Sequence, residues 1–262
     1  WHGHAGIFTY PIREAVAKKT PLMIWGEHGF ADLGGMHSYS DFVEFTFRYR
    51  HEHCLRGYEW YDMTDKALIE AGHHGLCEGL KNHELVTWKY PSDVEIEELG
   101  VRGIYISNFI KWEASSHSEM MINEYGFEPY PEDFDRTYKR LSNLDDMHEN
   151  GVHDYLKFIK FGYGRASDHC SKDIRDGKLT RDSAIEIVNR MDPKKPSDLY
   201  RWLKYVGMCE AEFDYISDTF RDPRVWWIKD GKWWKHTIDG GPKSYGQVFL
   251  PKNEQVRYQN YG

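Results

Sequence analysis

The sequence is poor in cysteine, lacks long apolar runs and has no excess of basic residues. No segment approaches the roughly 20 apolar residues that a membrane-spanning helix needs, so we expect no membrane insertion. The four cysteines (Cys54, Cys77, Cys170 and Cys209) have no repeating spacing, which argues against a disulfide framework and favours a reducing, cytoplasmic location. The 34 Lys and Arg residues against 42 Asp and Glu give a formal net charge of -8, which argues against a nucleic-acid partner.

The chain is long enough, at 262 residues, for a sizeable core in one large domain or two small ones. Aromatic residues make up 16% of it, including 10 Trp and 18 Tyr. These rings suit either a sugar- or nucleobase-binding surface or a Trp- and Tyr-rich core, and composition leaves both open. The chain starts with Trp1 and continues directly into a domain-like pattern, so we expect it to be a fragment of a longer protein.

The first half reads as alternating helix and strand. A helical pattern over Ile7–Lys19 precedes the apolar run Leu22–Trp25, and a second apolar run covers Gly103–Asn108. Short, uniformly apolar strands after helices predict a buried parallel sheet. Ligands of such sheets bind beyond the carboxyl ends of the strands, so Glu27 and His28 are candidate site residues. Pro11 should fall in the first turn of the first helix, Ser92–Leu99 should be helical with Gly100 as its stop, and Asp41–Leu85 should form an irregular helical excursion.

The second half is predicted to be mainly helical. An Asp-Gly pair between two Trp-rich runs, Val225–Ile228 and Trp233–His236, predicts a terminal β-hairpin, and the tail after Gly240 reads as loose. The predicted fold is therefore α/β, with a parallel sheet and helical excursion in residues 1–112 and a helical lobe with the hairpin in residues 113–262. The helices expected in this lobe are Gly151–Phe161, Asp168–Asp176 capped by Ser167, Arg181–Met191 capped by Thr180, Asp198–Val206 capped by Ser197, and Glu210–Phe220.

The stretch "FGYGRASDHCSKDIRDG" concentrates ionisable side chains directly after two glycines. Gly162 and Gly164 allow close backbone approach to a ligand, and a capped helix start offers N–H groups to an anion. Together with Arg165 and the upstream Lys157 and Lys160, they predict a grip for phosphate or carboxylate. The alternative is a surface helix crossed by Asp168–Lys172 and His169–Asp173 ion pairs, and spacing alone does not separate the two.

Two clumps of histidine and cysteine contain residue types that bind metals. His51-Glu52-His53-Cys54 and His73-His74-Gly75-Leu76-Cys77 match no standard zinc spacing, so we predict no metal site. Leu33-Gly34-Gly35-Met36-His37-Ser38 lacks the Ser and Asp of an ATPase pyrophosphate loop and is predicted to be a turn.

Four stretches together resemble the later parts of N-acetyl sugar amidotransferases, ATP-dependent enzymes of surface-polysaccharide and lipopolysaccharide (O-antigen) biosynthesis in the PP-loop ATPase superfamily. The similarity runs from about His4 to the Trp hairpin and is most specific in Gly-x-Gly-Arg-Ala-Ser-Asp-His. The stretches are "HAGIFTYPIREAVAKKTPLMIWGEHG", "GVRGIYISNFIKW", "SNLDDMHENGVHDYLKFIKFGYGRASDHCSKDIRDGKLTRDSAIEIV" and "FRDPRVWW" with "GKWW".

The resemblance implies a partial Rossmann-like sheet of the PP-loop type and conversion of an N-acetyl group on a nucleotide sugar to an acetamidino group. The amide oxygen attacks the α-phosphorus of ATP, pyrophosphate leaves, and ammonia from a separate glutaminase pair displaces AMP. ATP and Mg²⁺ are the implied cofactors, and zinc belongs only to a cysteine-rich N-terminal segment that this sequence does not contain.

The residue roles that this resemblance suggests are hypotheses. His169, oriented by Asp168 or Asp173, would manage protons at the ammonia step. The substrate- and nucleotide-binding candidates are Glu27, His28, Lys160, Gly162, Gly164, Arg165 and Arg175.

The sequence departs from the family by lacking the PP-loop, and Gly3 stands where a family cysteine is expected. We therefore expect no ATP hydrolysis by this chain alone. Two alternatives remain: another PP-loop adenylating enzyme such as a tRNA thiolase, which the net charge disfavours, and a non-catalytic sugar-binding module.

Overall fold

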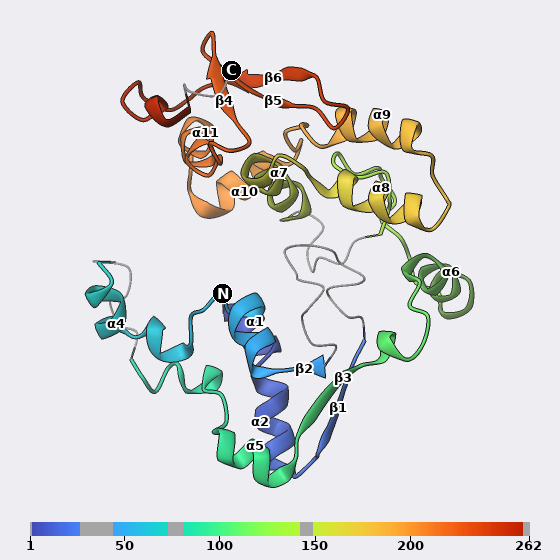
Figure 1. Ribbon diagram of the computed structural model, residues 1–262, viewed down its shortest axis with the longest axis vertical. Helices are drawn as coiled ribbons and strands as arrows, with labels where there is room; N and C mark the ends of the chain where they lie inside the picture. Colours follow the sequence, from blue (N-terminus) through green and yellow to red (C-terminus); the bar gives the residue numbers. More distant parts are fainter. Residues whose placement is uncertain (1, 27–43, 73–80, 142–148, 259–262) are drawn as a thin grey trace. The chain divides into compact units, whose positions relative to one another are not determined.

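The computed structural model describes residues 2–26, 44–72, 81–141 and 149–258. The chain forms two compact units, Trp1–Ala114 and Ser115–Gly262, and each is described by itself below. The predicted α/β class is confirmed: a small sheet with a parallel strand pair comes first, and helices with a terminal hairpin follow (Figure 1). Within the described parts, no helix combines the length and apolarity needed to cross a bilayer.

The first unit is built on a three-stranded sheet of order β1-β3-β2. Strand β1 (Leu22–Trp25) pairs in parallel with β3 (Arg102–Tyr105), as predicted, with Leu22 opposite Arg102. The short antiparallel strand β2 (Glu44–Phe45) was not predicted, because two residues carry no periodic signal. The remaining elements are α1 (His2–Ile7), α2 (Tyr10–Ala17), a π-helical turn η1 (Tyr49–Cys54), the 3-10 turns η2 (Trp60–Met63), η3 (Val86–Trp88) and η4 (Ile106–Asn108), α4 (Asp65–Glu70) and α5 (Asp93–Leu99).

Local chemistry explains the helix ends of this unit. Pro11 lies in the first turn of α2, as predicted, where its missing N–H costs nothing. Ser92 and Glu95 form a reciprocal capping box at the start of α5, and Gly100 ends the helix in a left-handed conformation.

The prediction of a buried sheet is wrong for one face of β1. Phe45 and Tyr105 are buried in the core cluster of the unit, and Met23 and Trp25 of β1 pack against them. Leu22 and Ile24 alternate to the other face of the strand and are 49% and 61% exposed. The continuous apolar run therefore predicts burial of both faces of this strand, but only one face is packed.

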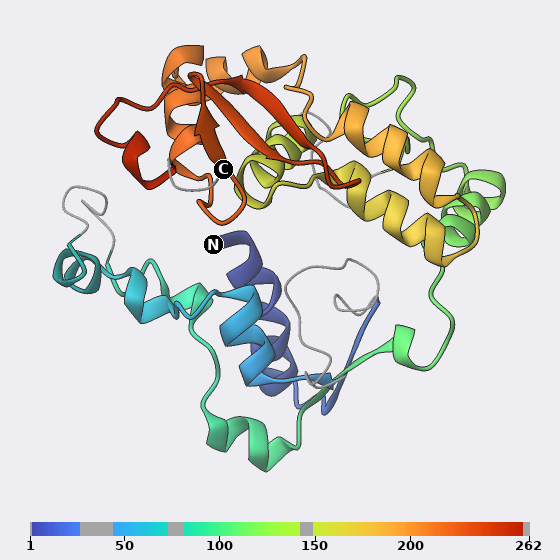
Figure 2. The ribbon, with the colours of Figure 1, turned by 45° about the horizontal axis from the view of Figure 1, so that its top comes forward.

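The second unit is mainly helical, with a three-stranded antiparallel sheet near its end (Figures 1 and 2). The elements of this unit are α6 (Ala114–Tyr125), α7 (Glu149–Phe161), α8 (Arg165–Arg175), α9 (Arg181–Met191), α10 (Leu199–Val206), α11 (Glu210–Thr219), β4 (Trp227–Lys229), β5 (Lys232–His236), β6 (Pro242–Gln247) and the 3-10 turn η5 (Gln255–Tyr258).

The predicted hairpin forms between β4 and β5. Asp230 and Gly231 both have positive φ, which is the geometry of a two-residue hairpin turn. Strand β6, in the tail predicted to be loose, adds a third strand to this hairpin.

Three apolar clusters hold this unit together. The largest surrounds the fully buried Trp226 and Trp233 and joins α7 to the hairpin. A second joins α7 to α10 and α11 around Phe213. The third joins α8 to α9 through Cys170 and Ala184, and both views show these two helices side by side (Figures 1 and 2). Much of the aromatic content of this unit is therefore core.

Candidate functional site

A cavity of about 340 Å³ lies in the second unit, where segment 130–137 runs past α7, α8 and the start of α10. Its volume is at the lower end of the range for small-molecule sites. Arg165, from the predicted grip, and His169, the predicted proton-handling residue, line it. Arg136, Thr137 and Asp154 line it too, although sequence analysis did not select them.

Helix α8 begins at Arg165, two residues before the predicted cap Ser167. The buried carboxylate of Asp192, at the end of α9, replaces that cap. It accepts hydrogen bonds from the N–H groups of Gly164 (2.8 Å) and Ala166 (3.1 Å) and from the Ser167 hydroxyl (2.6 Å). The helix start that was expected to bind an anionic ligand therefore binds a carboxylate of the protein itself.

The two glycines also serve internal packing. A Cβ on Gly164 would lie 2.7 Å from Oδ1 of Asp192 and 3.1 Å from an Nη atom of Arg136. Gly162 has φ +79, and its Cβ would lie 2.6 Å from Cγ1 of Val225. The close approach predicted for a ligand is thus made by the protein's own side chains, because Asp192 and Val225 occupy that space.

Arg136 is the buried cation of the cavity wall. Its Nη2 donates to the carbonyl oxygens of Asp154 (3.0 Å) and Asp192 (2.6 Å), and its Nη1 donates to the carbonyl of Lys194. Burial lowers the pKa of Arg136 to about 10, so the group stays charged at neutral pH. A lone arginine in an irregular loop has no periodic or motif signal, which is why the sequence did not reveal it.

Arg165 is held by Asp154. The Arg165 Nε and Nη2 lie 3.1 and 3.0 Å from Oδ1 of this carboxylate, and His153 Nδ1 lies 3.0 Å from the same oxygen. Burial opposes ionisation of Asp154, but the His153 hydrogen bond and the Arg165 charge outweigh burial and lower its pKa. Arg165 is therefore fixed in orientation, and its charge is largely matched.

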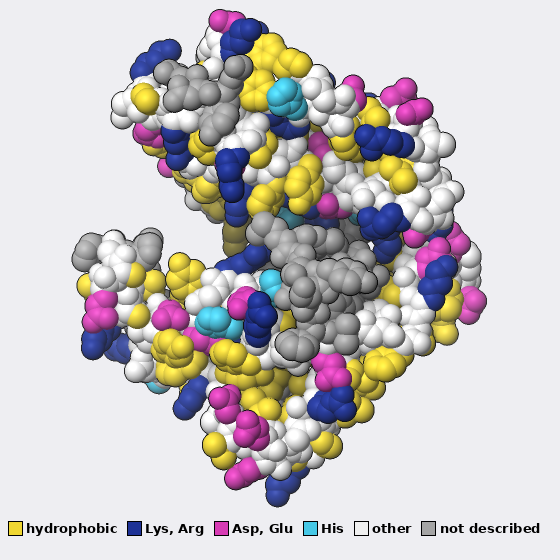
Figure 3. Space-filling view, in the orientation of Figure 1, with side chains coloured by type: hydrophobic (Ala, Val, Ile, Leu, Met, Phe, Trp, Pro, Cys, Tyr) yellow, Lys and Arg dark blue, Asp and Glu magenta, His cyan; other side chains and the backbone are white. Residues whose placement is uncertain are grey.

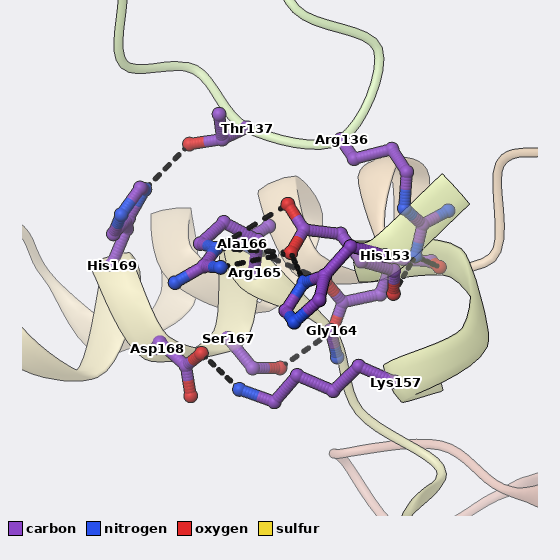
Figure 4. Close-up of polar contacts among 12 residues, drawn as sticks. Arg136, Thr137, His153, Lys157, Gly164, Arg165, Ala166, Ser167, Asp168 and His169 are labelled. Atoms are coloured by element: carbon purple, nitrogen blue, oxygen red, sulfur yellow. Dashed lines mark hydrogen bonds and ion pairs between the residues drawn. The ribbon is translucent and has the colours of Figure 1, made fainter. Parts of the chain in front are cut away.

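His169 is oriented by Thr137, not by Asp168 or Asp173 as predicted. Its Nδ1 lies 2.6 Å from the Thr137 hydroxyl oxygen, which also accepts the Lys139 backbone N–H at 3.2 Å (Figure 4). This arrangement favours donation of the hydroxyl proton to Nδ1 and places the ring proton on Nε2. Burial, followed by the charges of Arg165 and Lys139, lowers the pKa of His169 to about 4, so the imidazole is neutral at pH 7.

The two carboxylates expected beside His169 have other partners. Asp168 pairs with the Lys157 ammonium (Figure 4). Asp173 accepts from the Lys139 ammonium at 2.7 Å and from the Tyr138 hydroxyl at 2.5 Å. The alternative of i, i+4 pairs along α8 is therefore replaced by pairs between α8 and its neighbours, and neither carboxylate lines the cavity.

Two predicted cations lie outside the cavity lining. Lys160 is exposed, and its ammonium nitrogen lies 5.1 Å from the centroid of the Phe161 ring. Arg175 is exposed and donates a hydrogen bond to the Ser171 hydroxyl at 2.8 Å. Glu27 and His28 lie outside the described residues. The structure thus brings Arg165 and His169 together and does not bring Lys160 and Arg175 to them.

The histidine clump in η1 is occupied by an ion-pair network. His51 Nδ1 lies 2.9 Å from Oε1 of Glu59, and the buried Arg50 donates to the same carboxylate at 2.7 and 2.8 Å. Within residues 2–26, 44–72, 81–141 and 149–258, no group of three His, Cys, Asp or Glu side chains could hold a metal ion. His73, His74 and Cys77 of the second clump, and segment 33–38, lie outside the described residues.

The cavity lining combines carboxylates with aromatic rings. The rings of Tyr130 and Phe134 stack at 4.7 Å, and Tyr200 adds a third ring. Asp135 accepts from the Ser197 N–H at 2.8 Å; although burial opposes its ionisation, hydrogen bonds from Lys194 and Ser197 lower its pKa. The charged lining residues are five acids (Glu132, Asp133, Asp135, Asp154 and Asp198) and three arginines (Arg136, Arg165 and Arg201).

This balance does not fit a triphosphate, because carboxylates outnumber guanidinium groups and the cations Arg136 and Arg165 already have acceptors. ATP therefore does not fit this cavity. Carboxylate oxygens accept hydrogen bonds from hydroxyl groups, and flat rings cover the apolar face of a sugar. The lining fits an uncharged, polyhydroxylated group.

The comparison with known families agrees with a carbohydrate setting. Residues 119–238, slightly less than half of the chain, match the family described as "LPS biosynthesis protein WbpG-like, C-terminal domain". This match supports a lipopolysaccharide biosynthesis protein family and covers most of the second unit, including every residue that lines the cavity. No curated protein matches the chain.

Proposed function

We propose that this chain provides the sugar-binding cavity of an ATP-dependent amidotransferase that converts the N-acetyl group of a nucleotide sugar to an acetamidino group. ATP with Mg²⁺ is the co-substrate in this proposal, and a separate glutaminase pair is the partner that supplies ammonia. The similarity of residues 119–238 to lipopolysaccharide biosynthesis proteins supports it. So does the resemblance of the Gly-x-Gly-Arg-Ala-Ser-Asp-His stretch to sugar amidotransferases.

One observation carries the proposal. Arg165 and His169, the central polar residues of that stretch, line one cavity together with the stacked rings of Tyr130 and Phe134. A surface helix crossed by ion pairs would not require this convergence. The carboxylates of the lining give the acceptors that a hexose needs.

His169 acts as a neutral hydrogen-bonding group in this proposal. With Nδ1 beside the Thr137 hydroxyl, its Nε2–H donates to the oxygen of the activated acetamido group as this oxygen leaves with AMP. A neutral donor stabilises the leaving oxygen without bringing a proton that would consume ammonia. Arg165, fixed by Asp154, sets the second wall and orients the sugar.

The test is amidination by the complete enzyme that contains this chain, with a UDP-N-acetyl sugar, ATP and ammonium chloride, followed by mass spectrometry of the nucleotide sugar. His169→Gln and Arg165→Met should each lower kcat/KM by about 100-fold or more, the scale of a lost polar catalytic group. Arg181→Met is the matched control, because Arg181 is exposed at the start of α9. This substitution removes the same charge outside the cavity. Turnover of His169→Gln at the wild-type rate would refute the role of the histidine.

Calorimetric titration separates the alternatives. An amidotransferase cavity should bind the UDP-N-acetyl sugar and lose this binding in Tyr130→Ala. A non-catalytic sugar module should bind the free N-acetylhexosamine as tightly as its nucleotide form. A tRNA thiolase should bind tRNA and ignore both sugars.

A further inference from the structure

A second cavity, of about 140 Å³, lies between the Gly162 turn after α7 and the hairpin strands β5 and β6. Its lining includes Lys235, Tyr245, Ser167 and Asp192, and neither Arg165 nor His169. Among the predicted site residues that the structure describes, Gly162 alone lines it. It is larger than a single water requires and smaller than the usual small-molecule site, so it suits one compact group.

Lys235 is the unusual residue of this cavity. Lys235 is only 8% exposed, and its ammonium group donates a hydrogen bond to the carbonyl oxygen of His236 at 2.6 Å. The rings of Tyr245 and Phe158 lie 5.1 and 5.8 Å away. No carboxylate of the described residues forms an ion pair with it, although buried charges in proteins are usually paired.

The carboxylate that shares the cavity is already used. Asp192 accepts three hydrogen bonds at the start of α8, and its charge acts to raise the pKa of Lys235 without forming an ion pair with it. Burial, with the charge of Lys243, outweighs Asp192 and lowers the pKa of Lys235. Asp239, in the connection between β5 and β6, is exposed and interacts with Lys243. A buried positive charge is thus left without a dedicated counter-ion.

Hydroxyl donors accompany this charge. Burial, with Asp239 and Asp192, raises the pKa of Tyr245 to about 12, so its hydroxyl keeps its proton at neutral pH. An ammonium and a neutral hydroxyl are the donors that an oxyanion needs, and hydrogen bonds to an ionised acceptor are the stronger kind.

We propose that the Lys235 cavity is a binding site for a single phosphate-type oxyanion, with Lys235 as the charged ligand and Tyr245 as a second donor. This site is distinct from the sugar cavity and does not rest on the proposed amidotransferase activity. It places an anion at the hairpin, in a cavity that Ser167 and Asp192 of the α8 start also line.

The test is calorimetric titration of the full chain with inorganic phosphate, pyrophosphate and UDP. Lys235→Met should weaken binding of each by about tenfold or more, as expected when a charge-assisted contact is lost. Lys243→Met removes the same charge from an exposed position on the next strand and should change affinity by less than about twofold. Absence of phosphate binding by the wild-type chain, or equal losses in both variants, would overturn the proposal.

A footprinting experiment covers the case in which Lys235→Met does not fold. An amine-acylating reagent is applied to the wild-type chain with and without phosphate, and modified lysines are quantified by mass spectrometry. Phosphate should protect Lys235 and leave Lys243 unchanged, whereas equal labelling of Lys235 in both samples contradicts the site. Tighter binding of UDP than of phosphate assigns the site to a nucleotide phosphate, and equal affinity assigns it to the free anion.

Discussion

Single residues show how far side-chain chemistry depends on partners that are distant in sequence. The charged stretch after two glycines predicts Arg165 as an anion contact, and the family resemblance suggests His169. Their orienting groups, Asp154 and Thr137, were not selected, since they lie 11 and 32 positions away. The prediction that Asp168 or Asp173 orients His169 is wrong, because helical spacing considers only residues of the same helix. Asp168 pairs instead with Lys157, and Asp173 pairs with Lys139 from another segment.

The titration of His169 is the prediction that belongs to this scale. Its folded-state pKa of about 4 lies below the value near 6.5 of an unfolded chain. The unfolded chain therefore binds the proton first, and the stability linked to this group is present above about pH 6.5 and lost as the pH falls toward 4. NMR of the imidazole nitrogens should give a midpoint near 4.

Arg165→Met should raise that midpoint, because the Arg165 charge is the second cause of the low pKa after burial. Arg175→Met removes an exposed charge farther along the same helix and should leave the titration midpoint of His169 unchanged. An ordinary midpoint in the wild-type chain would show that the ring is solvated.

Among the elements, those with a local cap or turn signal were predicted, whereas helices α1 and α6 were not. Thr180 caps α9, Gly207 ends α10, and the Asp-Gly hairpin forms, because each signal is local. Strand β6 was missed because its residues, "PKSYGQ", become a strand only by pairing with β5. Propensity is a weak guide where pairing supplies the stability.

The start of α8 gives the prediction at this scale. Asp192 is 2% exposed and joins α9 to α8 through three hydrogen bonds, so Asp192→Ala should lower the free energy of unfolding by about 3–5 kcal/mol. Urea unfolding followed by circular dichroism measures this loss. Asp176→Ala, an exposed aspartate just after α8, is the control and should cost less than about 0.5 kcal/mol. Equal effects of the two substitutions would contradict the capping role.

The whole molecule divides its core between two units. The clusters around Trp226, Phe213 and Cys170 all lie within Ser115–Gly262, while that of Ile12 and Tyr105 lies within Trp1–Ala114. On the face of the second unit drawn in Figure 3, basic and acidic side chains are interspersed among apolar ones. Our two proposals therefore rest on the local charges of the two cavities and not on a charged patch of this face.

A separate core predicts independent folding. Residues 115–262 produced alone should unfold in one cooperative thermal transition and bind inorganic phosphate with the affinity of the full chain, because Lys235 and its cluster are complete within this unit. Differential scanning calorimetry and titration measure both properties. A broad, non-cooperative transition would show that the first unit is needed for the fold of the second.

The sequence by itself determined the β1 and β3 strands, the Thr180 cap of α9, the glycine ends of α5 and α10, the hairpin turn and the motif that contains Arg165 and His169, since each depends on neighbouring residues and their spacing. Only the tertiary structure decided that Asp192 fills the start of α8, that Arg136 and Asp154 build the cavity wall, and that Lys235 is buried beside a second cavity. These features depend on contacts between side chains that are far apart in the sequence. The packing of α7, α8, α9 and the hairpin determines which of these side chains are in contact.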